Sequence, residues 1–286
     1  MSRNKQRTTA AASAPTPAME AAPAQPATLS YVTPTEFVEL PSRGQFYSPE
    51  HPLHNKEVVE MRYMTARDED ILTSRSLLKN GLAIERLLEN LIVDSEVQPN
   101  NLLIGDKNAL LVAARVSGYG ENYNVTIKCP SCNTNVAHDF DLSALSVNHG
   151  VQPDEDNASG VHKTDRGTFI AELPRTKFSV EFRLLTGEDE IYLSKASAQL
   201  AKLNLPDAGA TNLLKRLVVE VNGVNTPSEI HNFIDNMPAQ DARHLRACVQ
   251  VVTPNLDMTQ SIECSSCGAV TEMEVPFTSE FFWPKQ

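Results

Sequence analysis

Two Cys-x-x-Cys motifs constrain this chain more than any other feature of its sequence. They span Cys129–Cys132 and Cys264–Cys267 and hold four of the five cysteines. Each lies between strand-like runs and is followed by a residue that tolerates positive φ, Asn133 or Gly268. Two thiolates two residues apart on a tight turn face one soft cation, and two such turns complete a tetrahedral zinc site. The sequence therefore predicts one structural Zn²⁺ with the ligands Cys129, Cys132, Cys264 and Cys267.

The spacing between the two motifs is unusual for a zinc site. Residues 133–263 separate them, whereas an ordinary zinc ribbon has about 15–20 residues at this place. Some feature of the intervening chain has to bring the motifs back together.

An internal repeat explains this spacing. Residues 59–69 align with residues 180–190 with six of eleven positions identical, and residues 88–94 align with residues 214–220. Asp106 and Asp241 follow at matching places, and the two cysteine motifs come next at the same offset. Each copy then carries one motif, and the long spacing is the length of the repeat.

The predicted fold class is α+β with this internal duplication. Each copy is expected to form a strand, two helices, a short helix and then a strand–Cys-x-x-Cys–strand hairpin, and the shared four-cysteine, zinc-ribbon-like site joins the two halves. Thr65 with Asp68, and Thr186 with Asp189, are typical of capped helix starts. Breaks in the helices are expected at residues 80–81 and 205–207, which contain Gly and Pro.

The chain divides into four predicted segments. Residues 1–35 form an Ala- and Pro-rich tail, which is expected to be disordered because it has too few apolar residues to offset its chain entropy. Residues 36–147 form the first repeat and residues 168–286 the second. The polar, acidic residues 148–167 are predicted to be a linker or an exposed loop.

Composition and charge limit the partners. The formal net charge is −11, which argues against a general nucleic-acid binder because phosphate affinity needs a positive surface. No apolar run reaches the about 18 residues that span a bilayer, and the basic N-terminus lacks the apolar stretch of a secretory signal. We therefore expect a cytosolic protein without a membrane partner, whose reduced cysteines favour metal over disulfides.

Other interpretations of the cysteines are weaker. A redox-active Cys-x-x-Cys is expected at a helix N-terminus, where the thiol pKa falls, but strand-like residues flank both motifs. Each motif could instead form a separate metal site that a histidine completes. His138 follows the first motif, but no histidine is near the second. Cys248 lies in a helical stretch and is predicted to be a small core residue.

Catalytic motifs are absent from the sequence. It contains no Gly-x-Gly-x-x-Gly, no phosphate-binding loop ending in Gly-Lys-Ser/Thr and no nucleophile elbow. The acidic clusters at residues 68–70 and 188–190 are interpreted as helix caps. We therefore expect no enzymatic activity and no small-molecule substrate.

Two aromatic segments are candidates for a partner surface. Residues 40–47 combine a turn with Arg43, Phe46 and Tyr47, a residue combination typical of interface anchors. The C-terminus supplies Phe281, Phe282 and Trp283. The alternatives are that the first segment packs on its own domain and that the second closes the core of the second half.

Residues 40–44, residues 67–69 and the first cysteine motif together give a family resemblance. On these residues the chain resembles the T-even-like phage baseplate proteins over residues 36–284. The resemblance implies a non-enzymatic, zinc-stabilised component of the baseplate hub, or a chaperone for hub assembly. It implies other baseplate and hub proteins as partners, the host cytoplasm during assembly and the virion tail baseplate as locations, and no catalytic residues.

The alternative function is that of a zinc-ribbon regulatory protein that binds nucleic acid. It would need basic residues around the cysteine motifs, but only Lys128 adjoins the first, and Glu263 adjoins the second.

Overall fold

The computed structural model describes residues 32–150, 160–206, 208–277 and 281–283. The chain divides into residues 1–32 and residues 33–286, and the fold below is that of the second unit. Residues 1–31 of the predicted tail lie outside the described residues. The first strand begins at Thr35, the last residue of that predicted tail.

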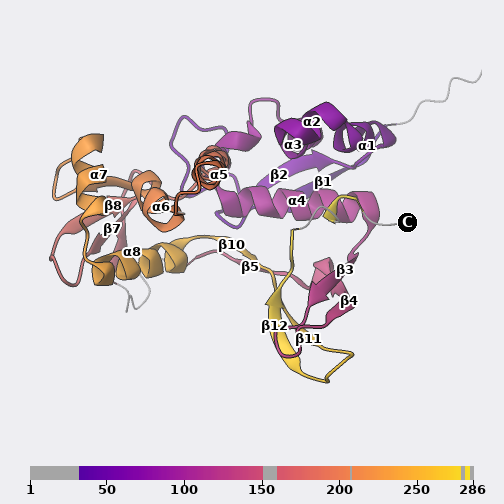
Figure 1. The fold of residues 1–286 in the computed structure, drawn as a ribbon. Coiled ribbons are helices and arrows are strands. Elements are labelled where there is room, and N and C mark those ends of the chain that lie inside the picture. The colour runs from indigo at the N-terminus through magenta and orange to yellow at the C-terminus, as the bar shows by residue number, and fades with distance from the viewer. Residues whose placement is uncertain (1–31, 151–159, 207, 278–280, 284–286) are drawn as a thin grey trace, which may run out of the picture. The chain divides into compact units, whose positions relative to one another are not determined.

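The first half contains a two-stranded sheet, four helices and a hairpin (Figure 1). Strand β1 (Thr35–Glu39) pairs antiparallel with β2 (Val58–Arg62). The helical elements are α1 (Ala66–Thr73), α2 (Arg75–Asn80), α3 (Ala83–Leu91), the 3-10 turn η1 (Pro99–Asn101) and α4 (Ile104–Tyr119). Strands β3 (Asn122–Lys128) and β4 (Asn135–Asp141) then form the hairpin. Helix α2 ends where predicted, because Gly81 adopts a left-handed φ of 68°.

The second half is built on a four-stranded antiparallel sheet in the order β6-β7-β8-β9. Its strands are β6 (Val161–Lys163), β7 (Phe169–Glu172), β8 (Ser179–Phe182) and β9 (Val218–Val221). The helices are α5 (Gly187–Lys202), α6 (Gly209–Leu217), α7 (Pro227–Asp235) and α8 (Ala239–Val252). Strands β11 (Thr259–Glu263) and β12 (Val270–Glu274) form its hairpin. The mixed α and β composition agrees with the predicted fold class.

Two predictions differ from the structure. The helix before each hairpin, predicted to be short, has 16 residues in α4 and 14 in α8. The segment 148–167, predicted to be a linker or exposed loop, includes β6, in which Val161 is fully buried because it pairs with Ala171 of the neighbouring strand. Residues 151–159 of that segment lie outside the described residues.

The two halves meet along backbone pairs and share one core. Strand β5 (Ser146–Asn148), which follows the short turn η2 (Leu142–Ala144), pairs with β10 (Asn255–Asp257), and Figure 1 shows these strands side by side. The amide of Gly187 donates to the carbonyl of Leu102 at 2.9 Å. At Gly105, a Cβ would lie 2.0 Å from the Pro254 carbonyl oxygen, so only glycine allows this approach. The buried apolar residues form one cluster that extends through both halves.

Helix α1 begins on a buried carboxylate. Asp68 is fully buried and accepts hydrogen bonds from the Arg62 guanidinium at 2.7 Å, from the Asn90 amide at 2.6 Å and from the Thr65 amide at 2.8 Å. Thr65 and Asp68 form the predicted capping box. The arginine and the asparagine satisfy a charge that would otherwise be costly to bury.

Helix α5 begins on a matching network. Asp189 is fully buried and binds Arg183 at 2.6 and 2.9 Å, the Arg216 Nε at 2.7 Å and the Thr186 amide at 3.0 Å. In the sequence alignment Arg183 corresponds to Arg62 and Arg216 corresponds to Asn90. The two networks agree with the aligned blocks, while the duplication as a whole stays a prediction.

No helix among the described residues is both long and apolar enough to cross a membrane.

The buried aspartates give a prediction for acid stability. Desolvation by burial is the largest single effect on the pKa of Asp68 and on that of Asp189, and it raises both. Hydrogen bonds outweigh it and lower each pKa to about 2. They come from Arg62 and Thr65 to Asp68, and from Arg183 and Thr186 to Asp189. Each carboxylate therefore stabilises the fold above the usual pKa of 3.8 and loses this contribution as the pH falls toward 2. We expect urea titrations to show the free energy of unfolding falling across this window.

Asp68→Asn is expected to lower the free energy of unfolding at neutral pH by about 3 kcal/mol, because it leaves Arg62 without its charged partner. Asp70→Asn is the matched control, since Asp70 is exposed on the same helix, and it should change stability by less than about 0.5 kcal/mol. Equal losses in the two variants would contradict a special role for Asp68.

Candidate metal centre and the predicted partner residues

The two cysteine motifs lie at the tips of two separate hairpins. The first connects β3 to β4 and the second connects β11 to β12. Figure 1 shows the hairpins next to each other, and the Gln260 side chain crosses between them to the backbone of Asp141. Side chains alternate along β3, with Tyr123, Val125 and Ile127 buried, so the inner face of the hairpin is apolar.

The two tips have the same backbone hydrogen bonds. In the first, the Cys129 amide donates to the Thr134 carbonyl and the Asn133 amide donates to the Cys129 carbonyl, each at 2.9 Å. In the second, the Gly268 amide donates to the Cys264 carbonyl at 2.8 Å. Asn133 and Gly268 both have positive φ, 60° and 69°. The predicted requirement for a left-handed residue after each motif is therefore confirmed.

The four sulfurs come together in space. The Sγ atoms of Cys129 and Cys267 are 3.9 Å apart, and those of Cys132 and Cys264 are 3.8 Å apart. All four ligand atoms lie within 4.8 Å of one another. A tetrahedron with metal–sulfur bonds of about 2.3 Å has edges of about 3.8 Å, whereas a disulfide would need about 2.05 Å. The cluster has the dimensions of a four-thiolate metal site.

The protonation of the thiols also favours a cation at this place. The pKa of Cys132 is lowered to about 6, mainly by hydrogen bonds from Thr134. The Ala269 amide lowers the pKa of Cys267, but hydrogen bonds to the other sulfurs outweigh it and raise this pKa to about 12. The backbone amides of Cys267 and Ser266 also lower the pKa of Cys264. The thiolate is the form that binds a metal ion.

The other cysteine and the nearby histidine are not part of the cluster. Cys248 is buried in α8, as predicted for a core residue, and burial raises the pKa of its thiol. His138 packs edge-on against Phe140, with ring centroids 4.7 Å apart. The structure brings the cysteines into one group of four, which is the shared arrangement that the sequence predicts.

The first predicted partner segment is mostly internal. Tyr47 is buried, and its hydroxyl donates to Asp106 at 2.7 Å and accepts from the Leu103 amide at 3.0 Å. Ser42 also donates to Asp106, through its amide at 2.9 Å and its hydroxyl at 2.5 Å. Burial raises the pKa of Asp106 despite these bonds, and no cation pairs with it among the described residues. The segment therefore holds the start of α4, and Tyr47 is not a surface anchor.

The other two residues of that segment differ in exposure. Phe46 is half-buried against Phe169, with ring centroids 5.3 Å apart. Arg43 is exposed at a positive φ of 50° and donates to the His149 ring at 2.8 Å. Of the three predicted contact residues in this loop, only Arg43 is exposed.

The C-terminal aromatic residues close a core, but in the first half rather than the second. Phe281 and Phe282 are buried, and the Phe281 ring packs edge-on against Tyr123 at 5.2 Å. The Trp283 indole donates to the Leu72 carbonyl of α1 at 2.9 Å. Phe281 and Phe282, predicted as candidate partner contacts, are therefore buried core residues. The alternative that the segment closes a core is correct in kind, but the core is that of the first half, because the chain returns there after β12.

A family comparison adds to this geometry. The model of the T4 bacteriophage base plate protein family matches residues 34–283, which include both halves and all four clustered cysteines. The chain belongs to this family. The resemblance predicted from the sequence is thus confirmed, and the protein has a structural role in the phage tail, among other base plate proteins. No curated protein and no solved structure matches the chain.

The shared site gives a prediction for paired substitutions. Cys129→Ser and Cys264→Ser should each lower the melting temperature by a similar amount, because either removes one ligand of the same ion. The double variant should add little to this loss, since neighbouring substitutions in one network are not additive.

Thermal unfolding followed by circular dichroism measures these effects. Cys248→Ala is the control, and it should leave the metal content unchanged even where it alters packing. Additive losses in the double variant would show two independent sites.

Proposed function

We propose that this base plate protein is a non-enzymatic component of the baseplate hub, or a chaperone for hub assembly, stabilised by one zinc ion. It would act through contacts with other baseplate and hub proteins, in the host cytoplasm during assembly and then in the tail. The observation that carries this proposal is the family match, because it extends over residues 34–283 rather than over one motif.

Zinc is the metal that best suits the cysteine cluster. Four thiolates in a tetrahedral arrangement are typical of structural zinc, which has no redox chemistry and no open coordination position in such sites. The spacings of 3.8 and 3.9 Å fit that geometry. A two-stranded hairpin is only marginally stable alone, so an ion shared by β3–β4 and β11–β12 would stabilise both.

The buried acids support a structural rather than a catalytic role. Asp68, Asp106, Asp189 and Asp241 are all fully buried. Each accepts hydrogen bonds from arginine, serine, tyrosine or backbone groups of this chain. A catalytic carboxylate needs an approach to substrate, and these carboxylates are engaged in holding the fold.

The charge around the cluster favours protein partners over nucleic acid. Lys128 is the one basic residue next to the first motif, and Glu263 precedes the second. The net charge of −11 would oppose contact with phosphates. These features do not support the alternative of a nucleic-acid-binding zinc ribbon.

Metal analysis tests the zinc part of this proposal. Elemental analysis of the purified protein should give one zinc ion per chain. Removal with a chelator should lower the melting temperature, because binding energy at a structural zinc site contributes to folding. Affinity should also fall at acidic pH, where protons compete for the thiolates. No zinc, or two ions per chain, would contradict the shared site.

A nonsense mutation in the phage gene for this chain tests the role in assembly. We expect infected cells to accumulate heads without complete baseplates, as seen by electron microscopy, and a copy of the gene supplied in trans should restore tails. Mass spectrometry of purified virions then separates the two roles, because a hub component is present in the particle and a chaperone is absent. Normal tails without the protein would overturn the proposal.

A further inference from the structure

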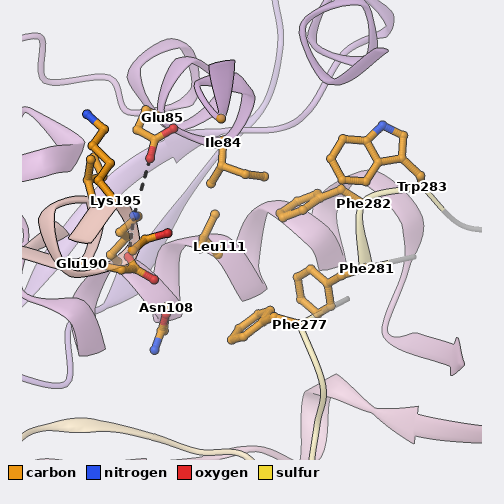
Figure 2. A pocket seen from close by; sticks show the side chains of 14 residues that line it. Ile84, Glu85, Asn108, Leu111, Glu190, Lys195, Phe277, Phe281, Phe282 and Trp283 are labelled. Carbon is orange, nitrogen blue, oxygen red and sulfur yellow. Dashed lines mark hydrogen bonds and ion pairs between the residues drawn. The ribbon is translucent and has the colours of Figure 1, made fainter. Parts of the chain in front are cut away.

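A pocket of about 550 Å³ lies between α3, α4, α5 and the C-terminal aromatic segment (Figure 2). Figure 2 shows apolar side chains along one side and through the middle of the pocket, and polar side chains at the other end. The apolar lining consists mainly of Ile84, Leu111, Phe277, Phe281, Phe282 and Trp283. The pocket therefore has an aromatic part and a charged part.

In the charged part of the pocket, one lysine contacts two glutamates. The ammonium group of Lys107, a buried side chain of α4, lies 2.9 Å from the Glu190 carboxylate of α5 and 3.9 Å from Oε1 of Glu85 in α3. The second oxygen of Glu85, Oε2, is buried and has no hydrogen-bond partner within the part of the chain that the structure describes. Glu85 as a whole is only 8% exposed. Its carboxylate thus combines deep burial with one unmatched oxygen.

The triad of Lys107, Glu85 and Glu190 leaves one buried carboxylate oxygen to be matched. Two carboxylates share one ammonium group, and Glu190 takes the shorter contact, although its side chain is 55% exposed. Lys195 also lines the pocket and is exposed, so water screens the charges of Lys195 and Glu190 alike. A carboxylate this buried interacts strongly with any donor that enters. The terminal torsion of a glutamate side chain is soft, so the Glu85 carboxylate can turn toward such a donor.

We propose that this pocket binds an arginine side chain, flanked by apolar residues, on a segment of another base plate protein. A guanidinium group presents several donors to a carboxylate and is weakly hydrated, so it can enter a buried site at low cost. The pocket offers the Glu85 carboxylate to the guanidinium at one end, and an aromatic part at the other end to the apolar residues that flank the arginine. The identity of the partner as a base plate protein rests on the proposed function.

A short peptide tests this site directly. The probe is acetyl-Leu-Arg-Leu-amide, compared with the same peptide carrying citrulline, which has nearly the same shape without the charge. Trp283 is the only tryptophan of the chain and lines the pocket, so its fluorescence reports binding, and calorimetry gives the affinity. We expect the arginine peptide to bind about 10-fold to 100-fold more tightly than the citrulline peptide.

Two variants on the same helix sharpen the test. Glu85→Gln keeps the shape but removes the charge, and it should abolish the preference for arginine over citrulline. Glu89→Gln is the matched control, because Glu89 is exposed on α3 and does not line the pocket, and it should keep the preference. The comparison of the two peptides on the unaltered protein does not depend on the folding of either variant.

Three results would overturn the proposal. The first is that the unaltered protein does not bind the arginine peptide, or binds both peptides equally. The second is that the Glu85→Gln variant keeps the preference for arginine. The third is that removal of residues 284–286 raises the affinity for the arginine peptide about 10-fold, which would assign the pocket to the chain's own C-terminus; we expect no change. The role in assembly is judged separately from the phage mutant, so failure here leaves that result standing.

Discussion

Four fully buried aspartates hold the structure together at the starts of its helices. Asp68, Asp106, Asp189 and Asp241 are each the third residue of a helix, α1, α4, α5 and α8 in turn. An acid at this position favours the positive helix end and can accept the unpaired amides there. Asp68 and Asp189 accept the amide of the residue that caps their helix, and Asp106 and Asp241 bind groups of a distant segment. The first pair therefore fixes helix starts, and the second pair fixes a helix start to the chain packed against it.

The distant partners show how these carboxylates organise the fold. Asp106 holds the loop at residues 42–47, which is 59–64 residues earlier in the chain, and Asp241 holds the amides of Arg175 and Thr176 at 2.7 and 3.0 Å. Asp68 instead binds Arg62, the last residue of β2, and Asp189 binds Arg183, which directly follows β8. With α4 and α8 oriented in this way, the hairpins that follow them bring their cysteines together.

The sequence predicts local features well because their causes are local. The capping boxes, the end of α2 at Gly81 and the turns after both cysteine motifs depend on neighbouring residues. The four-cysteine cluster was predictable over a long separation because four soft ligands on two identical turns leave few other arrangements. Exposure could not be predicted in the same way. Tyr47 is buried because of Asp106, and Trp283 packs on the Leu72 backbone, 211 residues away.

The charged triad in the pocket also has no sequence signal of its own. Glu85 lies among apolar residues of α3, where an acid normally suggests an exposed position. Its burial is offset in part by Lys107 of α4, which it shares with Glu190 of α5. A polar residue on the apolar face of a helix was the one available indication. The Glu85 carboxylate is buried among residues of both halves. Its position therefore depends on the assembled core, and local helix propensity does not predict it.

The metal centre and the pocket are connected through the chain that follows β12. The amide of Val275 donates to the Met258 carbonyl next to β11, and the Tyr123 hydroxyl donates to the Pro276 carbonyl. Tyr123 belongs to β3, the strand that leads to Cys129, and its ring packs against Phe281. The hairpins that hold the cysteines thus position the aromatic wall of the pocket. A structural ion at one end and a partner site at the other would be compatible roles for one protein, since an ion bound by the cysteines would supply rigidity to the proposed contact surface.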